Sequence, residues 1–153
     1  MAFIDAVANG NISPCRFVSM ATDADPASSQ ANSFKVIEDI IVAQPIVGVS
    51  QEGTDFFPSS DTVHYQTNAY AAVAGENIKV FGPGEQCLVE LGDTVHAGKM
   101  LKANATTNGK AVEVDMAGTT ATPQFVGAIA LQSGVSGEKI RVLVLPMVYT
   151  YHA

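Results

Sequence analysis

The clearest alternation of apolar and polar positions lies in residues 125–145 and predicts a β-hairpin. An apolar run is followed by a Gly/Ser-rich turn over residues 132–137. A second run then places Ile140, Val142 and Val144 at every second position. This two-residue period is that of a strand with one buried face.

The same pattern of side chains occurs twice in the chain. Residues 72–81 read AVAGENIKVF and residues 134–143 read GVSGEKIRVL, so Val, Gly, Glu, Ile and Val recur at the same places. A Val-Gly strand precedes each copy, IVGV at 46–49 and FVGA at 125–128. Two copies are too few for a solenoid, so we expect a pseudo-symmetric barrel or sandwich that uses one strand–turn–strand unit twice.

The remaining apolar runs also predict strands. Residues 34–42 favour a strand with a bend at Glu38-Asp39, with a short helix as the alternative, and further strands follow within residues 86–116. Turn signals recur about every eight to twelve residues, and no convincing amphipathic helix is present. We therefore predict a mainly-β protein, with a single β-barrel or sandwich domain over residues 34–153.

Residues 1–33 are expected to form an extended, irregular N-terminal arm. The segment is dense in turn formers and small polar residues, among them Asn-Gly-Asn at 9–11 and an Asp/Ala/Ser-rich stretch at 22–30. Its scattered large side chains would pack on the barrel of the same chain or on a neighbouring subunit. The candidate contact residues in the arm are Phe3, Ile4 and Phe17.

Residues 54–70 form an insertion into the first copy of the repeated unit. Three aromatic residues, Phe56, Phe57 and Tyr65, are the candidate contacts there, because aromatic side chains are favoured at protein interfaces. One interpretation is an exposed loop that binds a partner. The alternative is a lid that seals one end of the barrel.

Composition restricts the possible partners. The chain has 153 residues and a net charge of −7, which argues against nucleic acid or an anionic membrane as partner. Only 15% of its residues are charged, against about 25% in typical soluble domains, so we expect other proteins to cover much of the surface. The apolar runs are too short to cross a bilayer, and the N-terminus has no signal-peptide pattern, so synthesis in a cytoplasm is expected.

Residues with catalytic or ligating chemistry do not group along the sequence. His64, His96 and His152 lie in different segments, and Cys15 and Cys87 lack metal-ligand spacing, which favours buried thiols outside any disulfide. We therefore expect no enzyme, no cofactor and no metal site. Residues 92–101, GDTVHAGKML, are similar to the turn of biotinyl and lipoyl carrier domains, but no modifiable lysine tip follows, so a carrier is the weaker alternative.

The paired Val-Gly strands, the Gly-x-x-Gly-Glu turns and the closing FVGAIALQSGVSGEKIRVLV resemble bacteriophage head decoration (cement) proteins of a small β-barrel type. The resemblance covers residues 46–145 and leaves the arm and the insertion without a counterpart. It implies a homo-oligomer, a trimer or another small assembly, on the outer capsid surface of a virion. There it would bridge neighbouring major capsid proteins. A tail or head-fibre component is the alternative structural role.

Overall fold

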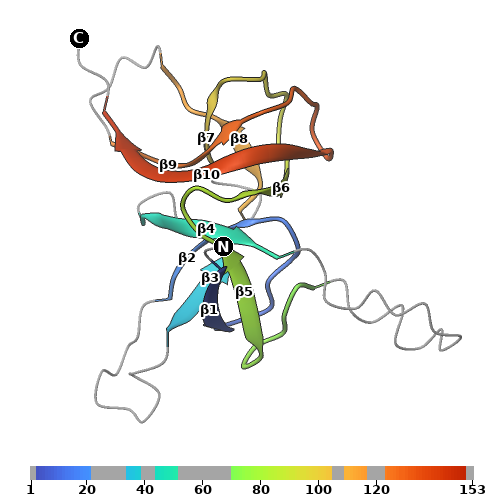
Figure 1. The fold of residues 1–153 in the computed structure, drawn as a ribbon, viewed down its shortest axis with the longest axis vertical. Coiled ribbons are helices and arrows are strands. Elements are labelled where there is room, and N and C mark those ends of the chain that lie inside the picture. Colours follow the sequence, from blue (N-terminus) through green and yellow to red (C-terminus); the bar gives the residue numbers. More distant parts are fainter. Residues whose placement is uncertain are drawn as a thin grey trace, which may run out of the picture.

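The computed structural model describes residues 3–21, 34–38, 44–51, 70–104, 109–116 and 123–150, which form two packed groups of strands (Figure 1). The first group is a closed barrel in the order β1-β3-β2-β4-β5. Its strands are β1 (Phe3–Ala8), β2 (Phe17–Met20), β3 (Lys35–Glu38), β4 (Ile46–Ser50) and β5 (Asn77–Phe81).

The second group is a five-stranded sheet in the order β6-β10-β9-β7-β8. Its strands are β6 (Gln86–Glu90), β7 (Met100–Ala103), β8 (Ala111–Glu113), β9 (Gln124–Ala130) and β10 (Lys139–Tyr149). The prediction of a mainly-β barrel or sandwich is confirmed. Within the described residues, no helix has the length and apolar character needed to cross a membrane.

The expected irregular arm is wrong for residues 3–20, because β1 and β2 are integral strands of the closed barrel. β1 pairs in parallel with β3 and antiparallel with β5, and β2 pairs with β3 and β4. The inward positions of β1 are Ile4, which is half-buried, and the small, fully buried residues Ala6 and Ala8, while Asp5 faces solvent. Alanine gives little hydrophobic contrast, so the two-residue period of this strand is weak in the sequence. Residues 22–33 lie outside the described residues.

Two other expectations fall partly outside the described chain. Residues 35–38 of the segment predicted as a strand or a short helix form a strand, β3, whereas residues 39–43 are not described. The insertion at 54–70 is described only at Tyr70.

The two groups of strands repeat one topology. In each, the first strand pairs antiparallel with the fifth, the fifth with the fourth, the fourth with the second and the second with the third. A register shift falls at the same place in both, between Val18 and Ser19 in β2 and between Leu101 and Lys102 in β7. We refer to residues 3–81 as the first repeat and to residues 86–149 as the second repeat.

The predicted equivalence of the two Gly-Glu turns agrees with the structure. Gly75 and Gly137 both have a positive φ, 87° and 88°. In each turn the glutamate that follows accepts a backbone hydrogen bond three residues upstream, Val73 N to Glu76 Oε2 at 3.0 Å and Val135 N to Glu138 Oε2 at 2.9 Å. The next inward residues, Ile78 and Val80 in one repeat and Ile140 and Val142 in the other, are all buried.

The equivalence of the two Val-Gly strands is wrong by one residue. Val49 pairs with Phe81 of β5, and Ile129 pairs with Leu143 of β10, so Gly48 corresponds to Ala128. Aligning Gly48 with Gly127 would shift the strand by one position and reverse every side chain relative to the core. The shared Val-Gly dipeptide therefore does not mark equivalent positions in the two repeats, whereas the strand register does.

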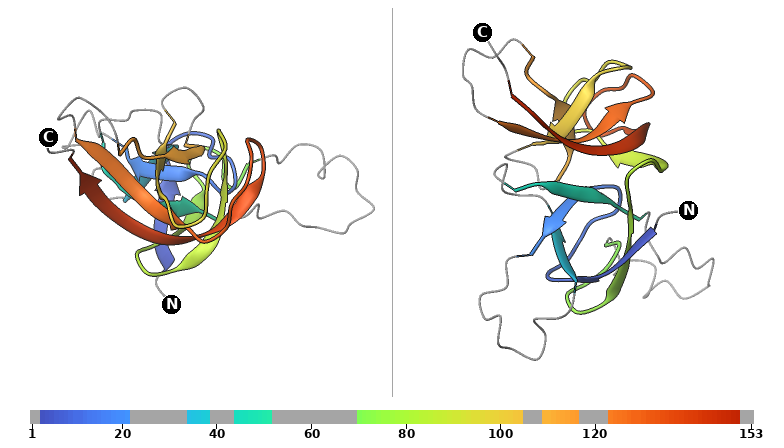
Figure 2. Two further views of the ribbon diagram at one scale, coloured as in Figure 1. Left: turned by 90° about the horizontal axis from the view of Figure 1, so that it is seen from above. Right: turned by 60° about the vertical axis from the view of Figure 1, so that its left-hand side comes forward.

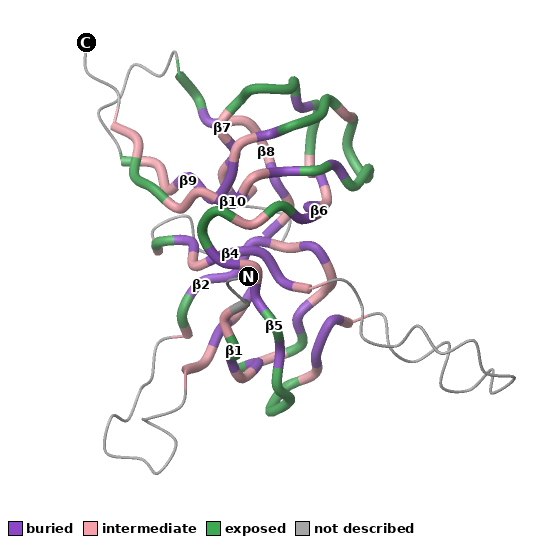
Figure 3. Tube along the Cα trace, in the orientation of Figure 1, coloured by how far each residue is buried: buried purple, intermediate pink, exposed green. Residues whose placement is uncertain are grey.

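The hydrophobic core has two parts, and the larger one joins the repeats. One buried cluster fills the closed barrel, including Ile12, Val18 and Ile78. The other contains Phe17 and Ile46 of the first repeat together with the inward residues of the second sheet. β4 packs against β9 and β10, and the curved β9–β10 hairpin covers it in both views of Figure 2. Figure 3 shows buried positions running through this junction, so the repeats form one continuous body.

Candidate interaction surface

The His, Cys, Asp and Glu side chains of the described residues do not gather into a metal site. No group of three or more His, Cys, Asp or Glu side chains in the described part could hold a metal ion. Cys15 and Cys87 are both buried, as predicted. His64 and His152 lie outside the described residues, and His96 is the one histidine within them.

His96 contacts Glu113 at the rim of an open polar depression of about 490 Å³. Glu113 Oε1 lies 2.8 Å from His96 Nδ1 and accepts the backbone N–H of His96 at 2.7 Å. The hydrogen bond with the His96 side chain lowers the pKa of Glu113 most, and the hydrogen bond from the His96 backbone lowers it further. In the first repeat, Glu38 likewise accepts the backbone N–H of Ser13, with no histidine present. The carboxylate therefore anchors a turn in both repeats, and the histidine is an addition to a structural contact.

The structure gives only part of the predicted contact set. Phe3 contributes backbone to β1, and Ile4 is half-buried against the core of the first barrel. Phe17 is fully buried between the repeats, which contradicts its expected role as a contact residue for a partner. Phe56, Phe57 and Tyr65 lie outside the described residues.

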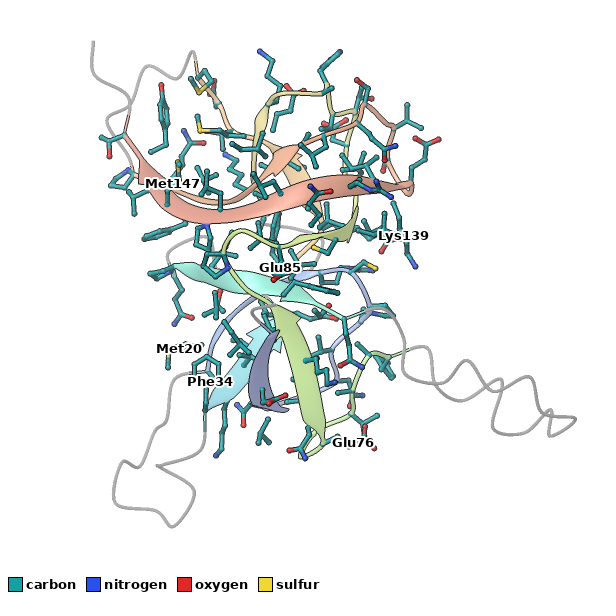
Figure 4. All side chains as sticks on the ribbon, viewed as in Figure 1. Met20, Phe34, Glu76, Glu85, Lys139 and Met147 are labelled. Atoms are coloured by element: carbon teal, nitrogen blue, oxygen red, sulfur yellow. The ribbon has the colours of Figure 1, made fainter. Side chains whose placement is uncertain are left out.

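An exposed apolar surface lies where β9 and β10 extend beyond the rest of the second sheet. β10 pairs with β6 through residues 139–143, and its last residues pair with β9, Met147 with Val126 and Val148 with Phe125. Met147 is 39% exposed and Val148 is 57% exposed. Figure 4 shows Met147 at this end of the hairpin. We refer to residues 124–126 and 145–149 as the β9–β10 ribbon.

The β9–β10 ribbon is free of charge. No Asp, Glu, Lys or Arg occurs in residues 116–137 or 142–153. Charge depletion with retained apolar side chains is the compositional mark of an interface core. The sequence prediction ended its hairpin at residue 145, before Pro146, and so missed Met147 and Val148. The uncharged apolar run that continues past the proline was the available signal.

A second exposed apolar area lies on the first repeat. Met20 is 52% exposed and, with Pro45 and Val47, lines a shallow depression of about 290 Å³. Met20 and Met147 lie on the same side of the molecule in the view of Figure 4. Each repeat thus exposes apolar side chains of its own.

No protein-family model matches the chain, and no curated protein sequence matches it. Among solved structures, the chain is similar to the head fiber gp8.5 N base of bacteriophage phi29. The sequence identity is 15%, the match covers 94% of this chain and 93% of that chain, and the TM-score is 0.49. A likeness at this level does not establish a shared function.

Proposed function

We propose that this chain is a structural, non-enzymatic protein that decorates the outer surface of a phage head. In this role it binds neighbouring major capsid proteins and bridges them, and it assembles on the shell as a homo-oligomer such as a trimer. A protein that binds only the assembled lattice stabilises that lattice by mass action, because opening the shell then requires the bound protein to dissociate.

The observation that carries the proposal is the uncharged, exposed β9–β10 ribbon. Met147 and Val148 are neighbours in one strand, so their side chains point to opposite faces of the ribbon and both faces offer apolar contact. Tyr149 pairs with Gln124 at the tip and adds an aromatic side chain. A stable interface buries about 800 Å² of surface on each partner. The ribbon would supply part of this area, and the surface next to it would supply the rest.

The charge balance of the described residues supports contact with a protein surface of mixed polarity. All eight Lys and Arg residues lie in the described part, together with nine of the fifteen acidic residues, so its balance is 8 − 9 = −1. The other six acidic residues lie outside it (Asp23, Asp25, Asp39, Glu52, Asp55 and Asp61). The described part of the two repeats is therefore nearly neutral, and apolar complementarity rather than long-range attraction would select their partner.

A tail or head-fibre component is the second structural candidate. In that role the chain would use the same surface to bind a different virion protein. The carrier alternative has less support. Lys99, Lys102 and Lys110 surround the candidate turn, but Lys102 Nζ donates to Gln124 at 2.8 Å and Lys110 lies 4.0 Å from Glu90. A carrier lysine has to project from a turn, whereas these two contact their own sheet.

The test is co-sedimentation of the purified protein with phage shells, comparing Val148→Asp with Val135→Asp. Val148 and Val135 are the same residue type and are 57% and 54% exposed, but Val135 lies in the turn before β10, away from the ribbon. We expect Val148→Asp to weaken shell binding by at least about tenfold, because a buried, unpaired carboxylate costs more than 1.4 kcal/mol. Val135→Asp should bind as the wild type does.

Thermal melts of both variants are the control for folding. Equal loss of binding by the two variants would refute the ribbon as the contact surface. Unchanged binding by Val148→Asp would refute it as well.

A further inference from the structure

The seam between β6 and β8 differs from its counterpart in the first repeat. In the first repeat, β1 and β3 pair directly, and the Val7 N–H donates to the Phe34 carbonyl at 2.8 Å. By the shared register, Glu90 and Gly109 are the equivalent residues of the second repeat. There the direct pairing is reduced to a bridge between Leu91 and Ala111, where the Gly92 N–H donates to the Ala111 carbonyl at 2.8 Å. The sheet of the second repeat is therefore not closed where the first repeat is, and its β6–β8 seam is open beside Glu90 and Gly109.

Residues 15–17 of the first repeat occupy this opening. The Glu90 N–H donates to the Cys15 carbonyl at 2.9 Å, and the Phe17 N–H donates to the Gly109 carbonyl at 2.8 Å. The two backbone groups that would otherwise pair with each other thus both pair with the inserted segment, residues 15–17. Cys15 has a φ of 58°, a conformation that is unfavourable for a residue other than glycine. The equivalent position in the second repeat is Gly98, with a φ of 86°.

The side chains of the seam match the inserted segment. Arg16 Nη2 lies 2.6 Å from Glu90 Oε2, with both side chains largely buried. Two glycines make room for Phe17: a Cβ on Gly127 would lie 2.5 Å from its ring, and a Cβ on Gly109 would lie 2.5 Å from its carbonyl oxygen. The seam therefore recognises backbone, a guanidinium and an aromatic ring at successive positions.

The first repeat lacks such a seam. Its residues at the positions of Glu90, Gly109 and Gly127 are Val7, Phe34 and Val47. They supply no carboxylate for an arginine and no space beside a glycine. The first repeat is the donor of the segment, the second is the receiver, and the roles cannot be reversed.

We propose that the β6–β8 seam is a binding site for an extended segment of an arginine followed by an aromatic residue, and that it can take this segment from a second copy of the chain. The donor residues belong to a barrel that is closed by itself, so they are presented in the same way whichever chain supplies them. The covalent connection between the repeats is residues 82–85, which follow β5 directly and lead into β6. Opening this short connection would exchange first repeats between two chains, a domain swap.

The experiment mixes two charge-reversed variants, Arg16→Glu and Glu90→Arg. Within either chain the seam then holds like charges, and Glu90→Arg also faces Lys110, which is 4.0 Å from Glu90 in the wild type. In a swapped pair, one seam regains the wild-type arginine and glutamate, and the other holds the same pair reversed. We expect each variant alone to have the mass of one chain by light scattering, and the equimolar mixture to contain a species of two chains.

The control is a single chain carrying both substitutions, which restores opposite charges in cis and should remain one chain. Hydrogen exchange verifies folding: β9 and β10 amides should stay protected in each variant, while the Glu90 and Phe17 amides lose protection and regain it in the mixture. If a charge reversal unfolds the chain, the pair Phe17→Leu and Gly127→Ala offers the same complementation through size. A mixture of folded variants that contains single chains alone would overturn the proposal.

Discussion

Gly127→Ala measures how tightly the two repeats are packed. The φ of Gly127 allows other residues, but a Cβ there would lie 2.5 and 2.7 Å from two ring carbons of Phe17 and 3.1 Å from Cδ1 of Ile46. Phe17 is fully enclosed, so its ring cannot move aside cheaply. Overpacking of this kind costs about 1–3 kcal/mol, which exceeds the roughly 0.4–1 kcal/mol that Gly→Ala gains by restricting the unfolded chain.

A double-mutant cycle with Phe17→Leu attributes the cost to this contact. Leucine is shorter than phenylalanine, so Phe17→Leu makes space for the added methyl group and should offset part of the loss. We expect the free energy of unfolding of the double variant, from urea denaturation, to exceed the additive value by about 0.5–2 kcal/mol. Strict additivity, or a Gly127→Ala variant as stable as the wild type, would refute the packing of Phe17 against Gly127.

Two further predictions concern the turns. Gly75→Ala and Gly137→Ala should each lower the free energy of unfolding by about 1–2 kcal/mol, because both glycines have φ near +88°. An added Cβ would contact nothing within 4 Å at either position, so backbone strain is the cost in both. Clearly unequal losses in thermal melts would contradict the equivalence of the repeats. Glu113→Gln should reduce stability at neutral pH and lose this effect in acid. The pKa of Glu113 is lowered on folding, so its contribution is present above its ordinary value of 4.5 and is lost as the pH falls through the lowered value; a difference from wild type that persists at low pH in urea titrations would argue against the His96 contact.

The sequence revealed the repeat where its turns are chemically alike. Both Gly-Glu turns need the same positive φ and the same glutamate acceptor, so Gly75 and Gly137 recur visibly. The repeat also includes β1 to β3 and β6 to β8, where the same geometry is built from other residues. Cys15 takes the left-handed position that Gly98 holds in the second repeat, and similarity of sequence is lost there while backbone geometry is retained.

The candidate surface was harder to predict than the fold. Phe17 is large and apolar within a segment of turn formers, which favoured contact with a partner, but Gly127 of the second repeat leaves space for its ring and Gly109 leaves space for its backbone carbonyl. Such a place depends on the packing of residues more than ninety positions apart and has no local signal. Val148 was missed because the predicted hairpin ended at residue 145, whereas β10 continues through Pro146 to Tyr149.

The most direct test of the proposed function is binding of the purified protein to assembled shells and to unassembled capsid subunits, followed by thermal opening of the decorated shells. A decoration protein should co-sediment with intact shells, remain unbound to free subunits, and raise the temperature at which the shells open, because preferential binding to the lattice stabilises it by mass action. Equal binding to free subunits, or decorated shells that open at the same temperature as bare ones, would contradict the account.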